Sequence, residues 1–379
     1  MDIIYLDNNA TTQPASEVVE AMLPYFREQF GNPSSGHLLG HLAEGALVQA
    51  REQVASLLHC QPAELVFNGG GTEGLNHALR GVFEALPTKR HFITTAVEHS
   101  ATLALADWLK RQGAKVTVLP VDGAGRLDLA QLEAALQPDT ALVSVMAANN
   151  ETGVLFPLEA IAPLVKAKGV LLHVDATQAV GKVPLDLTGL PVDLLNLSAH
   201  KFHGPKGVGA LFIRRGLRLK PFMVGGHQER GRRGGTENLP GIVGLGKAAE
   251  LAVGGLAQME EVRRRRDWLE ASLPDAVIHG AASARLPNTC FAAFPGIEGE
   301  ALLLRLSQRG ICVSTGSACT TGQKEASHVL RAMGVESGLA LATLRFSLSR
   351  YTTEDEIRSV VELLPTLCHE LRNRGPAGR

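Results

Sequence analysis

Short apolar segments alternate with segments of helical spacing through the first two thirds of the chain, and this alternation limits the folds it can adopt. We expect strands at 64–67, 91–95, 115–120, 141–147, 170–174, 194–197 and 208–213, and helices at 17–30, 42–59, 72–85, 100–112, 129–136 and 157–168. Strands that are nearly continuous apolar runs are typical of a mostly parallel sheet with both faces covered by helices. The sequence therefore predicts an α/β fold with a mostly parallel, seven-stranded sheet.

The pattern changes after Gly255. A strongly charged helix is expected at 259–273, and the shorter units that follow are typical of a second domain of the α+β type. Its arginine run at 263–266 follows two glutamates, so we interpret it as a solvated helix face. A capping box, Thr353-x-x-Glu356, marks the last helix. We predict a large domain of residues 15–255 and a small domain formed by 1–14 and 256–379.

The composition argues against several classes of protein. The 379 residues include 37 Lys and Arg against 38 Asp and Glu, so no global field favours nucleic acid or an anionic membrane. The five cysteines are odd in number and show no Cys-x-x-Cys spacing, which indicates a reducing compartment and no zinc site. No signal-peptide pattern is present, and no apolar run approaches the roughly 18 residues of a membrane span. We expect a soluble, cytoplasmic protein without a metal centre.

Three local patterns together indicate a cofactor. The run 68–73, Asn-Gly-Gly-Gly-Thr-Glu, follows a strand and opens a helix, where free backbone N–H groups favour an anion. Asp175 ends one apolar strand and Lys201 follows the next, so both are expected at the same sheet edge. Alone, each pattern is also explained by a plain turn or an exposed loop lysine. An anion cradle, a carboxylate for a ring nitrogen and a Schiff-base lysine together predict pyridoxal 5′-phosphate.

Other polar residues are expected at the same cleft. His99 follows a strand and can stack on a planar ring or exchange protons, although it also fits a helix N-terminus. The segment 149–153, Asn-Asn-Glu-Thr-Gly, places amide donors at the sheet edge, or forms a common Asn-rich turn. Arg345 lies within a strand-like run, where a substrate carboxylate is a suitable bidentate partner.

Cys319 lies among small polar residues in the segment 310–322. A thiol in such a segment is expected to be exposed and mobile, which suits a nucleophile that must reach a substrate. The alternative is a tolerated loop cysteine without a function. Cys312, between Ile311 and Val313, is expected to be a small buried strand residue.

The ordered motifs resemble those of the cysteine desulfurases in the class V aminotransferase group. The resemblance extends from residue 5 to about residue 371 and includes Tyr5-Leu-Asp-Asn-Asn-Ala-Thr-Thr12, Gly31-Asn-Pro-Ser-Ser35, Gly70-Gly-Thr-Glu73, Glu98-His99, Asn149-Asn-Glu-Thr-Gly153, Val174-Asp-Ala-Thr-Gln178, Ser198-Ala-His-Lys201, Gly204-Pro-Lys-Gly207, Glu229-Arg-Gly231, Gly235-Thr236, Ser317-Ala-Cys319 and Arg345-Phe-Ser-Leu348. It implies the type I fold of pyridoxal-phosphate-dependent transferases, a homodimer, and conversion of L-cysteine to L-alanine with a persulfide on Cys319.

The resemblance also implies a role for each site residue. Lys201, rather than Lys206, would carry the cofactor, and the acceptor thiol would be that of Cys319. Asp175 would hold the ring nitrogen, Gln178 would hold the ring hydroxyl, and His99 would stack on the ring. The phosphate would be bound by Gly71, Thr72, Ser198 and His200, together with Thr236 of the other subunit. The substrate carboxylate would be held by Arg345 and by Asn150, which also lies at the cofactor, and the entrance would be lined by Arg230 and Arg233.

Three rival functions share these cofactor motifs. An ordinary aminotransferase would need the same cofactor residues but would have no use for Cys319. A selenocysteine lyase would share the chemistry, and a catalytically silent cofactor-binding subunit would only scaffold a partner. Family members with housekeeping roles often have a longer C-terminal tail for docking, so the sulfur acceptor, such as an iron–sulfur scaffold protein, is left open by the sequence.

Overall fold

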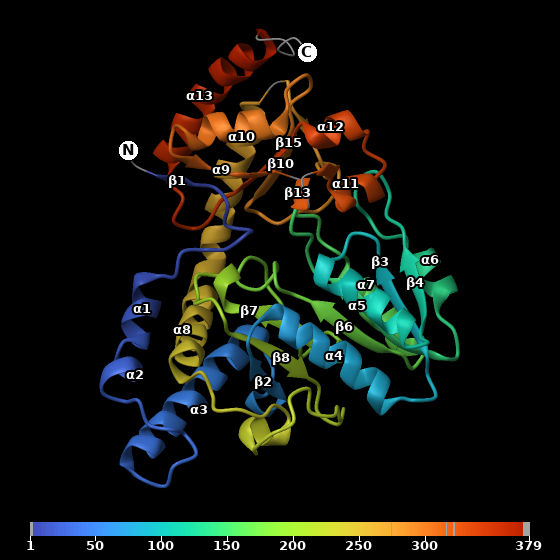
Figure 1. Ribbon diagram of the computed structural model, residues 1–379, viewed down its shortest axis with the longest axis vertical. Coiled ribbons are helices and arrows are strands. Elements are labelled where there is room, and N and C mark those ends of the chain that lie inside the picture. Colours follow the sequence, from blue (N-terminus) through green and yellow to red (C-terminus); the bar gives the residue numbers. More distant parts are fainter. Residues whose placement is uncertain (1–2, 274, 316, 321–322, 374–379) are drawn as a thin grey trace.

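The computed structural model describes residues 3–273, 275–315, 317–320 and 323–373, with the backbone alone described for 317–320 and 323–324. Figure 1 shows a large layered body, to which the first two thirds of the chain contribute, and a smaller body formed mainly by the C-terminal third. The chain passes between them through a long helix. The boundaries drawn from the sequence at residues 14/15 and 255/256 stay a prediction.

The larger body is built on the seven-stranded sheet in the order β2-β8-β7-β6-β5-β3-β4. Its strands are β2 (Leu65–Asn68), β3 (His91–Thr95), β4 (Lys115–Leu119), β5 (Thr140–Met146), β6 (Leu171–Asp175), β7 (Leu194–Ser198) and β8 (Gly209–Ile213). Only β8 runs antiparallel to its neighbours, β2 and β7. The predicted α/β fold with a mostly parallel sheet is therefore confirmed.

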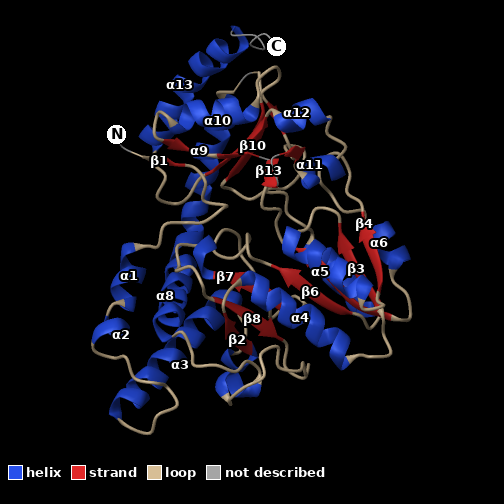
Figure 2. Cartoon of the chain, in the orientation of Figure 1, coloured by secondary structure: helices blue, strands red, loops and turns tan. Residues whose placement is uncertain are grey.

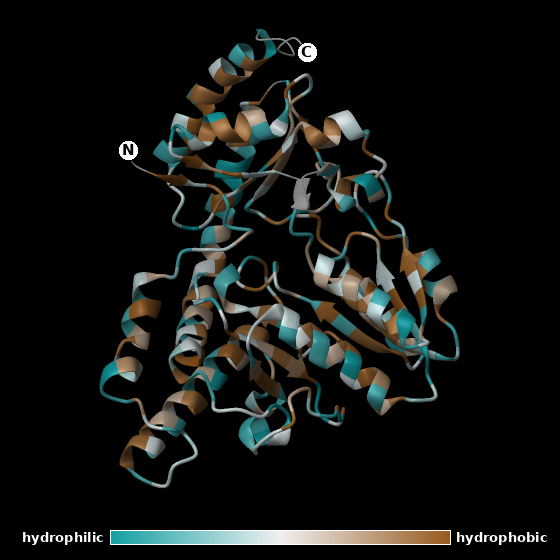
Figure 3. Cartoon of the chain, in the orientation of Figure 1, coloured by the Kyte–Doolittle hydropathy of each residue, from teal (hydrophilic) through white to brown (hydrophobic). Residues whose placement is uncertain are grey.

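Both faces of this sheet are buried, which explains the continuous apolar runs in the sequence. Within β2, Leu65 and Phe67 belong to one hydrophobic core and Val66 to another, because successive side chains point to opposite faces. In Figure 3 the central strands are largely coloured as hydrophobic. Apart from the edge strand β4, the sheet is thus buried on both faces, and polar side chains within it, such as Ser144 and His173, bond to one another. The polar groups open to a ligand lie at the strand ends.

Helices cover the two faces, as Figure 2 shows. They are α1 (Ser16–Met22), α2 (Pro24–Arg27), α3 (Leu38–Leu58), α4 (Gly71–Ala85), α5 (Ser100–Arg111), α6 (Leu129–Ala135), α7 (Leu158–Ala167) and α8 (Leu239–Gly255). The single helix expected at 17–30 is wrong. It is divided at Leu23 because Pro24 begins a new short helix, and helical structure ends at Arg27.

The smaller body has its own core. An antiparallel sheet in the order β12-β15-β10-β9 packs against helices, and β1 pairs in parallel with β11. The elements are β1 (Ile4–Tyr5), β9 (Val277–Ile278), β10 (Thr289–Ala293), β11 (Ile311–Cys312), β12 (Ser314–Thr315), β13 (Ser317–Thr320), β14 (Gln323–Ala326), β15 (Thr343–Ser347), α9 (Met259–Ala271), α10 (Gly299–Ser307), α11 (His328–Ala332), α12 (Ser337–Leu341) and α13 (Glu354–Asn373). The predicted capping box is confirmed, because the Thr353 N–H donates to the Glu356 carboxylate and the Glu356 N–H to the Thr353 hydroxyl.

The helical run Leu239–Ala271 departs from one expectation of the sequence. Within the described residues it is long and apolar enough, by length and composition, to cross a membrane, with a mean hydropathy of 1.2 over its most apolar window. Of that window, 56% is buried inside the structure. Its glycines pack tightly, since a Cβ on Gly246 would lie 2.6 Å from the Ala50 Cα of α3. We interpret it as a core helix.

A buried ion pair joins α3 to the turn η3 (Gln228–Gly231). Arg51 Nη2 lies 2.6 Å from Glu229 Oε1, with side-chain exposures of 9% and 3%. Arg51 Nη1 also donates to Glu229 Oε2, which accepts the Phe67 N–H of β2 at 3.0 Å. Removing one partner would leave the other charge buried and unpaired, which is strongly destabilising.

We therefore predict that Arg51→Ala lowers the free energy of unfolding by roughly 3–5 kcal/mol. The matched control is Arg263→Ala, which breaks an exposed pair with Glu260 and should cost no more than about 1 kcal/mol. Guanidinium denaturation followed by circular dichroism measures both. Equal effects of the two substitutions would show that the Glu229 carboxylate is not held by Arg51.

Candidate active site

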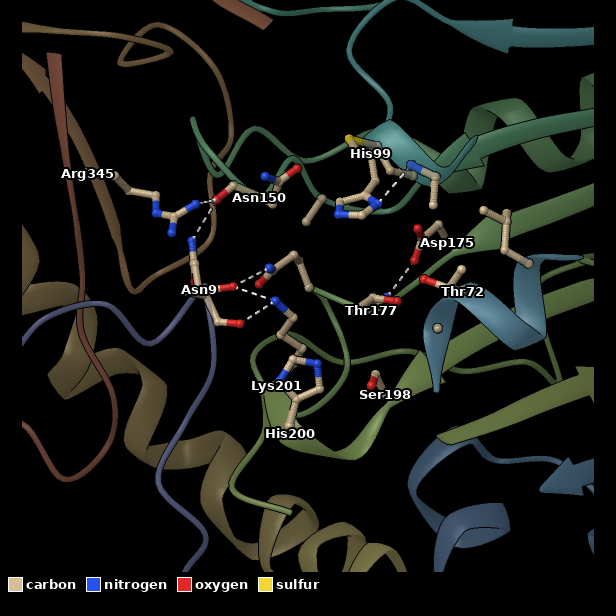
Figure 4. Close-up of a pocket in the computed structure, with 17 residues that line it drawn as sticks. Asn9, Thr72, His99, Asn150, Asp175, Thr177, Ser198, His200, Lys201 and Arg345 are labelled. Carbon is tan, nitrogen blue, oxygen red and sulfur yellow. Dashed lines mark hydrogen bonds between the residues drawn. The ribbon is translucent and has the colours of Figure 1, made fainter. Parts of the chain in front are cut away.

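A cavity of about 400 Å³ lies at the carboxyl ends of β5, β6 and β7, against the start of α4. This is the expected location for a ligand on a parallel sheet. Ten residues singled out in the sequence line it together: Gly71, Thr72, His99, Asn150, Asp175, Gln178, Ser198, His200, Lys201 and Arg345. Figure 4 shows these side chains around one space, with Arg345 of β15 reaching in from the smaller body.

The start of α4 forms the anion-binding end of the cavity. Gly70, the residue before the helix, has φ of +133°, a conformation that side chains rarely adopt. A Cβ on Gly71 would lie 3.1 Å from Thr177 Oγ1 and would occupy part of the cradle. Ser198 and His200 line the same end. Burial lowers the pKa of His200 to about 4, assisted by the charges of nearby lysines, so its imidazole is neutral near pH 7.

Asp175 ends β6 and presents its carboxylate to the cavity. Its Oδ1 accepts the Thr177 N–H at 3.0 Å and an Asn196 Nδ2–H at 3.1 Å. Within the described part of the chain, no cation lies within ion-pair distance of this carboxylate. These bonds hold the carboxylate in a fixed orientation and leave it able to accept from a ligand.

Lys201 lies at the end of the short turn η2 (Ala199–Lys201), which directly follows β7. Its Nζ donates to the backbone carbonyls of Asn9 at 2.7 Å and Ala10 at 2.8 Å. Burial lowers its pKa to about 8, repulsion from Arg345 adds to this, and Asp175 and Asp7 oppose it. A substantial fraction of this amine is therefore neutral near pH 7, as attack on an aldehyde requires.

His99 and Gln178 form opposite parts of the wall. His99 precedes α5, and its Nδ1 accepts the Ala101 N–H at 3.2 Å, so the imidazole caps the helix. Burial lowers the pKa of His99, which keeps the ring neutral. Gln178 Nε2 donates to the Asn9 carbonyl at 2.8 Å, and its Oε1 accepts from Lys182 at 2.8 Å.

Arg345 has two partners within the protein that the sequence did not predict. Its Nη2 lies 2.9 Å from Asp7 Oδ1, and its Nη1 donates to the Asn150 carbonyl at 2.9 Å. The contact to Asn150 therefore uses the backbone and not a side-chain amide. Its Nε is buried and has no hydrogen-bond partner among the described residues. The two contacts use one N–H bond of each terminal nitrogen, so each terminal nitrogen keeps a second N–H bond for a further anion.

Two predicted residues lie elsewhere. Thr236 lines a separate cavity of about 120 Å³, together with Gly69, Gly207 and Arg233. The backbone of Cys319 lies in β13, which pairs with β14 where an irregular loop was expected, and its side chain is outside the described part of the structure. Cys312 is in a strand, as predicted, but it is only half-buried.

Several contributors to the site were missed in the sequence. Asn9 and Ala10 line the cavity and accept from Lys201, Asp7 pairs with Arg345, and Asn196 holds Asp175. The only sequence signal was the polar run after the first strand, whose position next to residues 175–201 depends on the tertiary fold.

Comparison with known proteins agrees with this geometry. The family model Aminotransferase class-V matches residues 4–360. The chain belongs to the class-V aminotransferase family. Among curated members, Cysteine desulfurase 2 of Trichormus variabilis is 54% identical to this chain. The alignment covers 99% of this chain and 96% of the relative. Cysteine desulfurase NifS of Azotobacter vinelandii is 51% identical, with 98% of this chain and 94% of the relative aligned.

Solved structures of this family have the same fold. A NifS-like protein superimposes with a TM-score of 0.93 at 42% sequence identity. The match covers 98% of this chain and 100% of that chain. The structure described as SspA in complex with cysteine gives a TM-score of 0.82 at 33% identity, over 92% of this chain and 100% of that one. The resemblance inferred from the motifs is therefore confirmed at the level of the family.

Lys201 should react with an amine-specific reagent at lower pH than an ordinary lysine. Only the neutral amine is a nucleophile, so its labelling rate should rise with pH and level off above about 8. The reference is acetyl-lysine amide, whose pKa is about 10.4. The protein is first treated with hydroxylamine, which releases any aldehyde held on a lysine, and is then dialysed and labelled briefly at a series of pH values. Mass spectrometry of its peptides measures the rate. A Lys201 profile identical to that of the reference would contradict the buried, destabilised amine.

Proposed function

We propose that this chain is a pyridoxal 5′-phosphate-dependent cysteine desulfurase, which takes sulfur from L-cysteine as a persulfide on Cys319 and leaves L-alanine. One observation carries the proposal: a lysine with a lowered pKa, a fixed carboxylate and a helix N-terminus line a single cavity. The relatives named cysteine desulfurase, aligned over nearly the whole chain, give the substrate.

The residues present fit this cofactor. The unpaired first N–H groups of α4 and the space left by Gly71 suit a phosphate group, with Thr72, Ser198 and His200 beside it. Asp175 suits a protonated ring nitrogen, and neutral His99 suits the face of the ring. When bound, the cofactor would supply an aldehyde that captures amines and a ring that accepts electrons from the substrate.

Arg345 and Asn150 would hold the substrate carboxylate. Arg345 lines the cavity, and each of its terminal nitrogens keeps an N–H bond beyond those used by Asp7 and the Asn150 carbonyl. A second carboxylate would complete the donor set of the guanidinium, which is favourable because charge-assisted bonds to arginine are strong. The Asp7 carboxylate would then keep the guanidinium oriented from the other side.

Lys201 and His99 would handle protons. The lowered pKa of Lys201 makes its amine a base able to take the proton from the substrate Cα near neutral pH. His99 has a lowered pKa as well, so its neutral imidazole can accept or return a proton beside the ring. Both groups line the same cavity.

Cys319 would take up the sulfur. Its thiolate would attack the substrate sulfur, so an S–S bond forms while the Cβ–S bond breaks. The electron pair of the broken bond stays with the carbon skeleton, which takes up a proton and becomes alanine. The enzyme is left with a persulfide, and neither an oxidant nor a reductant is consumed in this step.

The finer parts of the proposal concern partners and location. The enzyme would act as a homodimer in the cytoplasm, with Thr236 serving the phosphate of the other subunit and Arg230 and Arg233 at the entrance. Support comes from the position of Thr236, which lies outside the cofactor cavity of its own chain and lines a separate cavity. The persulfide would pass to an acceptor protein such as an iron–sulfur scaffold.

The test is to mix the purified holoenzyme with L-cysteine and a thiol reductant and to measure alanine and sulfide. Equal amounts of both are expected from the wild type. Cys319→Ser should keep the cysteine-induced spectral change but release no sulfide. The matched control Cys60→Ser should behave as the wild type, because burial raises the pKa of the Cys60 thiol to about 12.

The outcomes separate the rival functions. Formation of a 2-oxo acid in place of alanine and sulfide would indicate an aminotransferase. Absence of any turnover with cysteine or selenocysteine would indicate a silent subunit. Undiminished sulfide release by Cys319→Ser would remove this thiol from the mechanism.

A further inference from the structure

Lys182 is a buried lysine with no role in the mechanism above. It is 7% exposed and lies one helical turn beyond Gln178, just after β6. No carboxylate of the described residues lies within ion-pair distance of it. Its Nζ instead donates to Gln178 Oε1 at 2.8 Å and to Asn9 Oδ1 at 3.2 Å. A buried amine without an acidic partner costs stability, so its retention calls for a physical reason.

The surroundings of Lys182 suit a neutral amine. Burial lowers its pKa well below the ordinary value, and repulsion from Lys201 and Arg345 lowers it further. A neutral amine has two N–H bonds, and two oxygen acceptors face Nζ. Both N–H bonds are used, so Lys182 acts here as a fixed pair of donors.

Asn9 is fixed by partners other than Lys182. Its Oδ1 also accepts from Asn288 Nδ2 at 3.0 Å, and its Nδ2 donates to the Asn150 carbonyl at 3.1 Å and to Thr289 Oγ1 at 2.9 Å. These contacts hold its amide in one orientation. The amide of Gln178, in contrast, has two hydrogen-bond partners among the described residues, Lys182 and the Asn9 carbonyl.

The two partners of Gln178 impose the same orientation. The Asn9 carbonyl can only accept, so it requires Nε2 on its side, and the N–H bonds of Lys182 require Oε1 on the other. A flipped amide would place oxygen against oxygen and N–H against N–H. Nε2 carries a second N–H bond, and Gln178 lines the cavity. Lys182 therefore secures Gln178 as a hydrogen-bond donor toward the ligand.

We propose that Lys182 is a positioning residue that keeps the Gln178 amide as a donor to the ring oxygen of bound pyridoxal 5′-phosphate, and so lowers the proton affinity of the Schiff base on Lys201. This inference rests on the proposed cofactor. A donor at the ring oxygen stabilises its negative charge, which makes the oxygen a weaker partner for the imine proton. Without Lys182 only the Asn9 carbonyl orients the amide, so the donor is lost for part of the time.

Other groups also act on this Schiff base. Asp175, His99 and His200 line the cavity around Lys201, Arg345 reaches in from β15, and Asp7 pairs with Arg345. These residues are the same in every variant, but Lys182 itself contributes to the lowered pKa of His200, so a comparison in the Gln178→Leu background is needed to separate that effect.

The experiment is a pH titration of the near-visible absorbance of the holoenzyme loaded with pyridoxal 5′-phosphate. Lys182→Met keeps the apolar stem and removes the donor. Its titration midpoint should lie about 0.4–1 unit above that of the wild type, which is the loss of one ordinary hydrogen bond. Lys168→Met, at an exposed lysine with 50% side-chain exposure, should leave the midpoint unchanged.

A double-mutant cycle decides whether Lys182 acts through Gln178. Gln178→Leu should raise the midpoint at least as much as Lys182→Met, and the double variant should show no rise beyond that of Gln178→Leu. An unchanged midpoint in Lys182→Met would overturn the inference. So would a Lys182 effect of full size in the Gln178→Leu background, which would indicate action through charge or packing alone. If Lys182→Met does not fold, Lys182→Gln replaces it in the same cycle.

The control for the underlying assumption is the wild type itself. If it shows no absorbance band that titrates after loading, the proposed cofactor is wrong. If it shows the band and the variants do not shift it, only the role of Lys182 is wrong.

Discussion

The burial of both faces of the central sheet determines where this chain can carry chemistry. Successive residues of β2 enter separate hydrophobic cores and β5 contributes residues to both, so neither face offers room for a polar ligand. Charged and amide groups are instead placed where the strands end, at Asp175, Ser198 and Lys201. The depth of burial at this edge also lowers the pKa of Lys201 to about 8. The burial of the sheet thus determines where the site lies and also lowers the pKa of the Lys201 amine.

The N-terminal segment completes what the sheet edge begins. The backbone and side chain of Asn9 contact Lys201, Lys182 and Gln178 of the larger body and Asn288 and Thr289 of the smaller one. Asp7, two residues earlier, holds the guanidinium of Arg345 from β15. A segment at the start of the chain therefore connects the cofactor side of the cavity with the substrate side. Displacement of this segment would be expected to disturb both together.

The sequence predicted what depends on local patterns and short spacings. Strand periodicity placed Asp175 and Lys201 at one edge, and the glycines before α4 located the anion cradle, because these relations follow from the geometry of parallel strands. It did not predict the contacts that Asn9 and Asp7 make with the rest of the site, since they join positions more than 140 residues apart along the chain, and it did not single out Lys182, which contacts Asn9 across a similar separation. The ion pair of Arg345 with Asp7 was missed for the same reason. The sequence predicted one helix at 17–30, because the apolar spacing on both sides of Pro24 is that of a single helix, but this proline divides it.

The central claim is that Lys201, held by the Asn9 and Ala10 carbonyls at the cavity floor, is the amine that binds the cofactor. The most direct measurement is reduction of the holoenzyme with borohydride followed by peptide mapping of the pyridoxyl group. The account predicts one modified residue, Lys201, and no cofactor adduct after Lys201→Ala. An adduct on Lys206 or on Lys182, with Lys201 unmodified, would contradict it.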